Sequence, residues 1–200
     1  DSSDTHPYAV EREVEDLDAL IKEAGGPASL FGMSSGAALA LEAAAGGLDV
    51  PKLALYEPPF NTQEPERQVS RAYTAELHAL LSEGRRSDAA ALAMASFGTP
   101  VEVVAGMRQM PIWAAFESVA PTLAYDNAVM GDGFVPAERW SAVRTPVLVV
   151  DGGDSPAFMH SAADAAAAAL PNGMRLTLPG QTHRFDPAVL APVLVEFFGG

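Results

Sequence analysis

The 200-residue sequence contains no cysteine, which excludes disulfide bonds, thiol nucleophiles and thiolate metal sites. The absence of cysteine also fits a reducing compartment, so we expect a cytoplasmic protein. The spacing of the four histidines is not typical of metal ligands. They are His6, His78, His160 and His183. We therefore expect neither a metal site nor a cofactor.

Basic residues are scarce. Twelve Lys and Arg face 26 Asp and Glu, which gives a formal net charge of −14. A phosphate backbone would be repelled, so nucleic acid is not an expected partner. No apolar run approaches the ~18 residues that a membrane-spanning helix needs, so no membrane partner is expected either. With 48% apolar and 19% charged residues, the composition is that of a globular chain with a sizeable core.

The most informative segment is Gly32-Met33-Ser34-Ser35-Gly36. Apolar residues precede it and an alanine-rich stretch, 37–46, follows it, which predicts a buried strand, a tight turn and a helix. On such a turn a Gly-x-Ser-x-Gly motif lifts the serine hydroxyl out of the backbone. The N–H groups and the positive end of the following helix favour negative charge at the same point. The segment therefore predicts Ser34 as a nucleophile, and an ordinary tight turn is the alternative.

Strands and helices alternate on both sides of a long helical stretch. The expected helices outside that stretch span residues 8–24, 37–46, 156–170 and 187–198, and the expected strands lie just before Ser34 and at 52–56, 146–150 and 174–178. Strands separated by helices predict a mostly parallel sheet with helices on both faces. The predicted class is α/β with a doubly wound sheet.

A helical insertion interrupts this alternation. We expect residues 1–59 and 136–200 to form one core domain, and residues 60–135 to form the insertion. The insertion is rich in methionine and aromatic residues, which suits a lid over an apolar pocket. We expect Met110 and Trp113, with Met33 of the core, to line the substrate pocket. For most of the insertion's apolar residues, packing in its own core is the alternative.

A serine hydroxyl needs an imidazole that takes its proton, and reactive groups of parallel sheets collect at the carboxyl ends of strands. Two such ends carry suitable residues. The segment Asp151-Gly152-Gly153-Asp154 follows one predicted strand, and Gly180-Gln181-Thr182-His183 follows the next. The order serine, acid, histidine is the one expected for an α/β hydrolase.

From residue 8 onward the chain resembles the α/β-hydrolase superfamily, through the motif at 32–36, the acidic turn, the histidine loop and the helical insertion. The resemblance implies that Ser34 is the nucleophile, that His183 is the general base and acid, and that the backbone N–H of Ser35 is an oxyanion donor. The implied activity is that of a serine hydrolase that cleaves an ester, a lactone or a thioester of a small apolar substrate through an acyl-enzyme. A non-hydrolytic member that binds a small molecule, or a lyase or cyclase, is the alternative.

The acid of the implied triad has more than one candidate. In the family it usually comes three residues after a glycine of this turn, which here is Ser155. We favour Asp154, one residue earlier. The main alternative is Glu57, at the end of the preceding strand, where some members carry the acid.

The family's first strands, and the loop that supplies a second oxyanion N–H, would precede this sequence. The segment Asp1-Ser2-Ser3-Asp4 resembles the acidic turn just before the first helix of the retained half. We therefore expect a missing N-terminal segment of the same polypeptide, roughly 60 to 80 residues by typical domain size. It should pack beside the strand that enters Ser34, because an exposed sheet edge is unstable alone.

Overall fold

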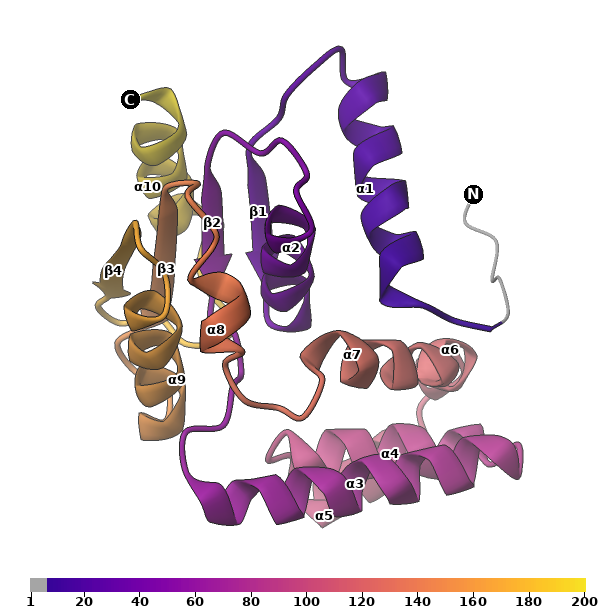
Figure 1. Ribbon diagram of the computed structural model, residues 1–200. Helices are drawn as coiled ribbons and strands as arrows, with labels where there is room; N and C mark the ends of the chain where they lie inside the picture. Colours follow the sequence, from indigo (N-terminus) through magenta and orange to yellow (C-terminus); the bar gives the residue numbers. More distant parts are fainter. Residues whose placement is uncertain (1–6) are drawn as a thin grey trace. The chain divides into compact units, whose positions relative to one another are not determined.

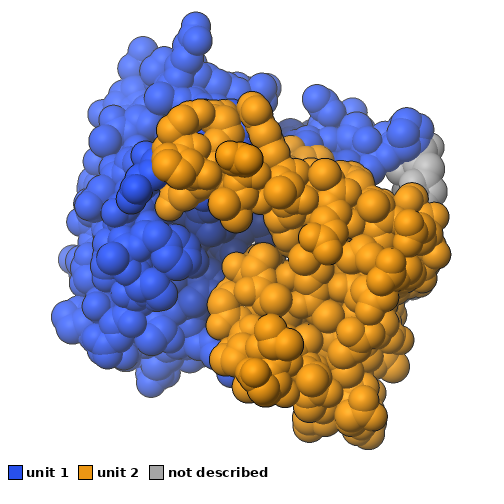
Figure 2. Space-filling view, turned by 90° about the horizontal axis from the view of Figure 1, so that it is seen from below, with its two compact units in different colours: residues 1–63, 129–200 blue, residues 64–128 orange. Residues whose placement is uncertain are grey.

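A computed structural model describes residues 7–200, which form two compact units. Residues 1–63 and 129–200 belong to the first unit and residues 64–128 to the second (Figure 2). The second unit lies within the insertion that the sequence predicts at 60–135. The expected acidic turn at residues 1–4 and His6 lie outside the described residues.

The first unit contains a four-stranded parallel sheet in the order β1-β2-β3-β4 (Figure 1). Its strands are β1 (Leu30–Met33), β2 (Leu53–Tyr56), β3 (Val147–Gly152) and β4 (Gly173–Leu178). In the register of the sheet, Leu53 pairs with Leu30 on one side and with Val147 on the other. All four strands run in the same direction, so their carboxyl ends lie along one edge. The predicted α/β class and parallel sheet are confirmed.

Helices cover both faces of this sheet. The helices of the first unit are α1 (Val10–Glu23), α2 (Ser35–Ala45), α8 (Ala137–Trp140), α9 (Ala157–Ala168) and α10 (Pro187–Gly199). The first four share a core with Leu55 and Val149, whereas α10 shares a core with Tyr56 and Val150. Side chains alternate between the two faces along a strand, so these cores lie on opposite sides of the sheet. The sheet is doubly wound, as the sequence predicts.

The regular secondary structure of the second unit, residues 64–128, is helical. It is built from α3 (Glu64–Ser82), α4 (Arg86–Ser96), α5 (Val101–Met107), α6 (Trp113–Val119), the 3-10 helix η1 (Ala120–Thr122) and most of α7 (Leu123–Met130). These helices enclose a core of their own around Leu77, Val104 and Trp113. In the chain, the unit is inserted between β2 and β3.

Within residues 7–200, no helix has both the length and the apolar character that crossing a membrane requires.

Candidate active site

Ser34 lies on the sharp turn between β1 and α2. Its backbone has φ 55° and ψ −128°, in a region that residues with a side chain rarely adopt. The amide of Ser34 donates to the carbonyl oxygen of Tyr56 at 2.9 Å, and its own carbonyl accepts from the amide of Ala37 at 3.0 Å. One hydrogen bond to the neighbouring strand and one within the turn therefore hold the strained conformation, as is common at functional sites.

The first glycine of the motif is required by the close approach of α2 to β1. A Cβ atom at position 32 would lie 2.4 Å from the carbonyl oxygen of Gly36 and 2.7 Å from the Cα of Ala37. A Cβ at Gly36 itself would meet nothing within 4 Å. Of the two glycines of the motif, only Gly32, within β1, is therefore fixed by sterics.

Ser35 begins α2, an 11-residue helix whose first turn carries no acidic residue. The positive end of the helix macrodipole lies at this first turn. No carboxylate of α2 offsets that partial charge, so negative charge developing at the turn would be stabilised. This placement is compatible with the oxyanion role expected for the Ser35 N–H.

The carboxylate that contacts His183 belongs to Glu57, which directly follows β2. Its Oε2 lies 2.7 Å from Nδ1 of the imidazole. The other oxygen, Oε1, accepts from the amide of Gly152 at 2.9 Å and from the hydroxyl of Ser155 at 2.5 Å. Glu57 is completely buried and has φ 47°, a second strained backbone position at the end of a strand.

Asp154, which we favoured from the sequence, is not the partner of the imidazole. Its side chain is exposed, and its amide donates to the carbonyl of Gln181 at 2.9 Å. The turn after β3 therefore directs Asp154 toward solvent, while Ser155 points at Glu57. The geometry favours Glu57, the alternative at the end of the preceding strand, and which carboxylate serves as the acid stays a prediction.

Electrostatics keep Glu57 ionised. Burial raises the pKa of this carboxyl, but hydrogen bonds from His183, Ser155 and Gly152 outweigh burial, so that the pKa lies below its usual value. An ionised carboxylate only accepts hydrogen bonds, so Nδ1 of His183 must be the donor. In the neutral imidazole Nε2 then carries the lone pair and can accept a proton.

Tyr56, for which the sequence predicted no role, holds the loop that carries His183. Its hydroxyl donates to the carbonyl oxygen of Thr182 at 2.7 Å, and its ring lies 4.7 Å from the ring of Phe185, between centroids. Burial raises the pKa of Tyr56 to about 12, and the charges of Glu57 and Asp151 add to this effect. The phenol therefore remains a donor.

The dipeptide Tyr56-Glu57 thus connects the turn that carries Ser34 with the loop that carries His183. The backbone of Tyr56 bonds to Ser34, its side chain bonds to the loop before His183, and Glu57 bonds to the imidazole itself. A Cβ at Gly152 would lie 2.3 Å from the carbonyl oxygen of Gln181, so the histidine loop also packs directly on the end of β3. The structure brings Ser34, Glu57 and His183 to the same edge of the sheet.

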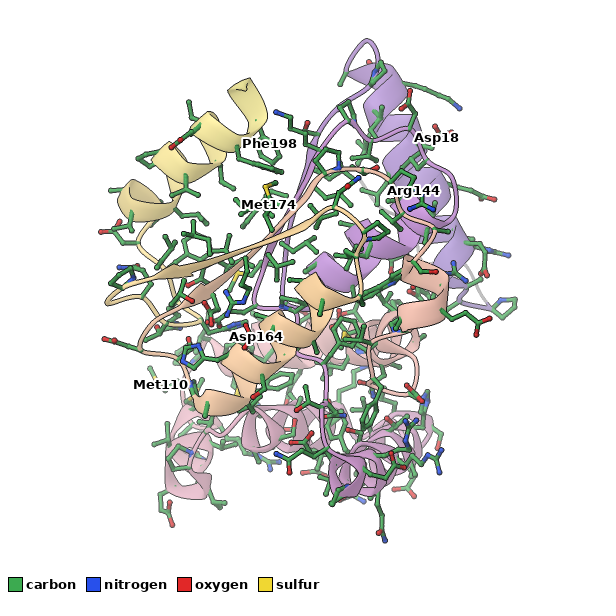
Figure 3. The ribbon with its side chains drawn as sticks, turned by 60° about the vertical axis from the view of Figure 1, so that its left-hand side comes forward. Asp18, Met110, Arg144, Asp164, Met174 and Phe198 are labelled. Carbon is green, nitrogen blue, oxygen red and sulfur yellow. The ribbon has the colours of Figure 1, made fainter. Side chains whose placement is uncertain are left out.

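A second ionic cluster occupies the end of β3. Asp151 is fully buried and accepts from both terminal nitrogens of Arg175, at 2.8 and 2.6 Å, and contacts Nδ1 of His160. Arg175 also bonds to Asp164 on α9 at 2.9 Å; Asp164 is labelled in Figure 3. Burial raises the pKa of Asp151, but hydrogen bonds from Arg175, Thr177 and His160 lower it further than burial raises it. This cluster ties α9 to β3 and β4.

The residues expected to line a substrate pocket lie in both units. Met33 is half-buried at the end of β1, in the core that α10 covers. Met110 is 54% exposed (labelled in Figure 3), and Trp113 is 5% exposed in the core of the second unit. The indole of Trp113 donates to the hydroxyl of Ser87 at 2.8 Å. Packing within the insertion accounts for the burial of Trp113, and the pocket assignment stays a prediction.

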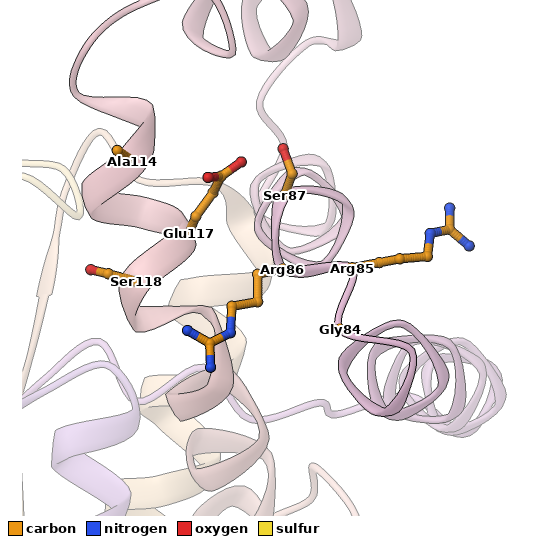
Figure 4. Close-up of a pocket in the computed structure, with 7 residues that line it drawn as sticks. All are labelled: Gly84, Arg85, Arg86, Ser87, Ala114, Glu117 and Ser118. Atoms are coloured by element: carbon orange, nitrogen blue, oxygen red, sulfur yellow. The ribbon is translucent and has the colours of Figure 1, made fainter.

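A shallow cavity of about 450 Å³ lies on the second unit (Figure 4). Its lining comes from the turn before α4 and the start of that helix, and from α6. The side chains of Arg85 and Arg86 point away from each other, and Arg86 extends toward α6. None of the candidate catalytic residues lines this cavity. Among residues 7–200, no three or more His, Asp or Glu side chains are grouped as metal ligands.

Comparisons with known proteins support the fold. An alpha/beta hydrolase from Sphaerobacter thermophilus is 49% identical, with a TM-score of 0.85, and the match covers 99% of this chain and 77% of that one. Two more distant structures share the fold. An alpha/beta hydrolase from a deep-sea metagenome library, MGS-M2, has a TM-score of 0.68 at 15% identity, and the match covers 100% and 75% of the two chains. E-2-(acetamidomethylene)succinate hydrolase has a TM-score of 0.62 at 19% identity, with 100% and 77% covered.

No protein with curated annotation is a significant sequence match. The sequence model of the alpha/beta hydrolase family, in contrast, matches residues 1–193. On this match, and on the 49% identical relative, the chain belongs to the alpha/beta hydrolase family.

Proposed function

We propose that this chain is a serine hydrolase that cleaves an ester, a lactone or a thioester of a small apolar substrate. Ser34 is the nucleophile, His183 the general base and acid, and Glu57 the carboxylate that orients the imidazole. The observation that carries this proposal is the 2.7 Å contact between Nδ1 of His183 and the buried Glu57, at the sheet edge where the strained turn presents Ser34. Family membership supports a hydrolase in general.

In the proposed mechanism Glu57 accepts a hydrogen bond from Nδ1–H, so that the lone pair of Nε2 is available for the proton of the nucleophile. As Oγ of Ser34 attacks the carbonyl carbon, Nε2 takes the hydroxyl proton. The carbonyl oxygen becomes negative near the first turn of α2, where the N–H of Ser35 donates to it. Collapse of this intermediate breaks the bond to the leaving group, which receives the proton from His183.

The resulting acyl-enzyme is an ester of Ser34. His183 then takes a proton from a water molecule, whose oxygen attacks the acyl carbon. When the second intermediate collapses, its bond to Oγ of Ser34 breaks, His183 returns the proton to Oγ, and the acid is released. Because Glu57 stays ionised throughout, it stabilises the imidazolium that forms in each half of the cycle.

A fluorophosphonate probe tests the proposal, since it forms a stable phosphonyl ester with an activated serine. We expect one adduct on the wild-type chain, located at Ser34 by peptide mass spectrometry, and none on Ser34→Ala. Ser161→Ala removes an exposed hydroxyl on α9 and should be labelled at the wild-type rate. An adduct elsewhere, or a wild-type chain that is never labelled, would favour the non-hydrolytic alternative.

A further inference from the structure

We propose that the cavity on the second unit binds a small zwitterion, a molecule with a carboxylate at one end and an ammonium group at the other, as in a free amino acid. Arg86, at the start of α4, holds the carboxylate, and Glu117, on α6, holds the ammonium group. None of the candidate catalytic residues lines this cavity, so the site does not depend on whether Ser34 is a nucleophile.

Two opposite charges line the cavity without partners of their own. Neither the guanidinium of Arg86 nor the half-buried carboxylate of Glu117 makes an ion pair or a hydrogen bond with the residues that the structure describes. Arg86 extends toward α6, and Glu117 extends toward α4 (Figure 4). The nearby Arg85 and Arg108, in contrast, both bond to Asp88, at 2.9 and 2.8 Å. The second unit thus leaves one cation and one anion at the cavity free for a ligand.

Two serines of the lining add a hydrogen-bond donor and an acceptor. Oγ of Ser87 accepts from the indole of Trp113 at 2.8 Å and from Arg108 at 3.2 Å. Its own O–H has no acceptor within the described part of the chain, so this proton is available to a ligand. The hydroxyl of Ser118 donates to the carbonyl of Ala115 at 2.7 Å, which leaves its oxygen able to accept. The lining therefore complements both ends of a zwitterion.

The packing of α4 against α6 holds this lining in place. Trp113 is 5% exposed in the core of the second unit, and its ring centroid lies 5.8 Å from the guanidinium carbon of Arg108. Because both of these side chains donate to Ser87, that serine is fixed from two directions. A site whose polar groups are already held loses less conformational entropy when a ligand binds.

Charge and volume favour a zwitterion over a simple ion. The formal net charge of the chain is −14, which disfavours the approach of a plain anion. A plain cation that pairs with Glu117 would leave Arg86 unsatisfied. A zwitterion carries no net charge and pairs with both groups. The cavity volume of about 450 Å³ lies within the ~300–1,000 Å³ typical of small-molecule sites.

Titration of the ¹⁵N-labelled full chain with 4-aminobutyrate tests this site. Arg86 and Glu117 do not pair with each other, so the two charges of the probe must lie apart, as the flexible chain of 4-aminobutyrate allows. We expect it to shift the amide resonances of Ser87 and Ser118 and the indole resonance of Trp113, with a dissociation constant in the millimolar range. Butyrate and butylamine, which each lack one charge, should bind about threefold more weakly, the effect of one partly exposed ion pair.

Two variants remove the charges of the cavity one at a time. Arg86→Gln should weaken the binding of 4-aminobutyrate about threefold and leave that of butylamine unchanged. Glu117→Gln should weaken the binding of 4-aminobutyrate to a similar extent and leave that of butyrate unchanged. Arg71→Gln and Glu76→Gln are the matched controls, because both side chains are exposed on α3 and neither lines the cavity. Both controls should bind as wild type does.

An absence of shifts with all three probes would overturn the proposed site. Equal affinities for 4-aminobutyrate and butyrate would also overturn it, since the ligand would then be a simple anion, and so would unchanged binding in both cavity variants. The indole resonance of Trp113 shows in each case that the second unit is folded. Ser34→Ala should bind 4-aminobutyrate as wild type does, so this test and the labelling of Ser34 can fail independently.

Discussion

At the scale of single residues, backbone strain marks the candidate site. Among the residues that the structure describes, Ser34 and Glu57 are the two non-glycine residues with positive φ. Each directly follows a strand, β1 and β2 respectively, and each is held by tertiary hydrogen bonds. Such positions cost about 1–3 kcal/mol each and persist where the surrounding structure imposes them. Their coincidence with the proposed nucleophile and acid supports a functional origin of the strain.

Neutralising the two candidate acids tests which one serves His183. Glu57→Gln keeps the shape of the side chain but can present an N–H to the imidazole, which favours the wrong tautomer. We expect labelling of Ser34 to slow by about 10³–10⁴-fold, as for loss of charge at the acid of other triads. Asp154→Asn, at an exposed side chain, should remain within about twofold of wild type. The opposite ranking would restore Asp154 as the acid.

At the scale of elements, the packing of α2 on β1 shapes the turn that carries Ser34. The buried face of α2 consists of Leu41 and small alanines, which let the helix backbone come close to the strand. The distance is short enough that a Cβ at Gly32 would overlap the backbone of α2. The Gly-x-Ser-x-Gly pattern therefore has one glycine that serves packing and one, Gly36, with open space around it.

Replacement of each glycine by alanine should have opposite effects on stability. Gly32→Ala places a methyl group 2.4 Å from the carbonyl oxygen of Gly36, so the strand and the helix must separate. We expect a loss of about 1–3 kcal/mol in the free energy of unfolding, typical of overpacking. The new methyl group of Gly36→Ala meets no atom within 4 Å. Because alanine lowers the backbone entropy of the unfolded chain, we expect the free energy of unfolding to rise by up to about 1 kcal/mol. Urea unfolding measures both changes in free energy. A destabilised Gly36→Ala would contradict the conclusion that Gly36 has open space around it.

At the scale of the whole molecule, two buried carboxylates at the ends of β2 and β3 make the first unit sensitive to acid. Glu57 and Asp151 are both fully buried, and both have a pKa below the usual value. In the unfolded chain these groups titrate near pH 4. At that pH the unfolded state binds more protons than the folded state, so stability rises with pH. The contribution is complete above the unfolded pKa and is lost as the pH falls through the lowered folded pKa.

Asp151→Asn should therefore flatten the acid dependence of the first unit. We expect its unfolding free energy to be lower than wild type at neutral pH, because Arg175 loses its buried partner, and to fall less steeply below about pH 4. Hydrogen exchange of the β3 amides follows this unit alone. Asp164→Asn is the control, since its side chain is 71% exposed and should leave the slope nearly unchanged. If the unfolding free energy of Asp151→Asn falls with pH in parallel with that of wild type, Asp151 does not contribute to the acid sensitivity.

The sequence by itself determined the local elements and their class. The strand, turn and helix around Ser34, the parallel sheet and the helices on its two faces follow from periodicity, glycine sterics and the rules of strand connection, which all act over short stretches of chain. The order of serine and histidine along the chain likewise needed no coordinates.

Only the tertiary structure decided which carboxylate meets the imidazole. Glu57 and His183 are 126 residues apart, and Asp154 follows a neighbouring strand at the same sheet edge. Both acids therefore follow strands whose carboxyl ends lie near the loop that carries the histidine. The choice depends on the positive φ of Glu57 and on the turn that directs Ser155 inward and Asp154 outward. Such side-chain directions arise from packing between distant segments, to which no local sequence pattern corresponds.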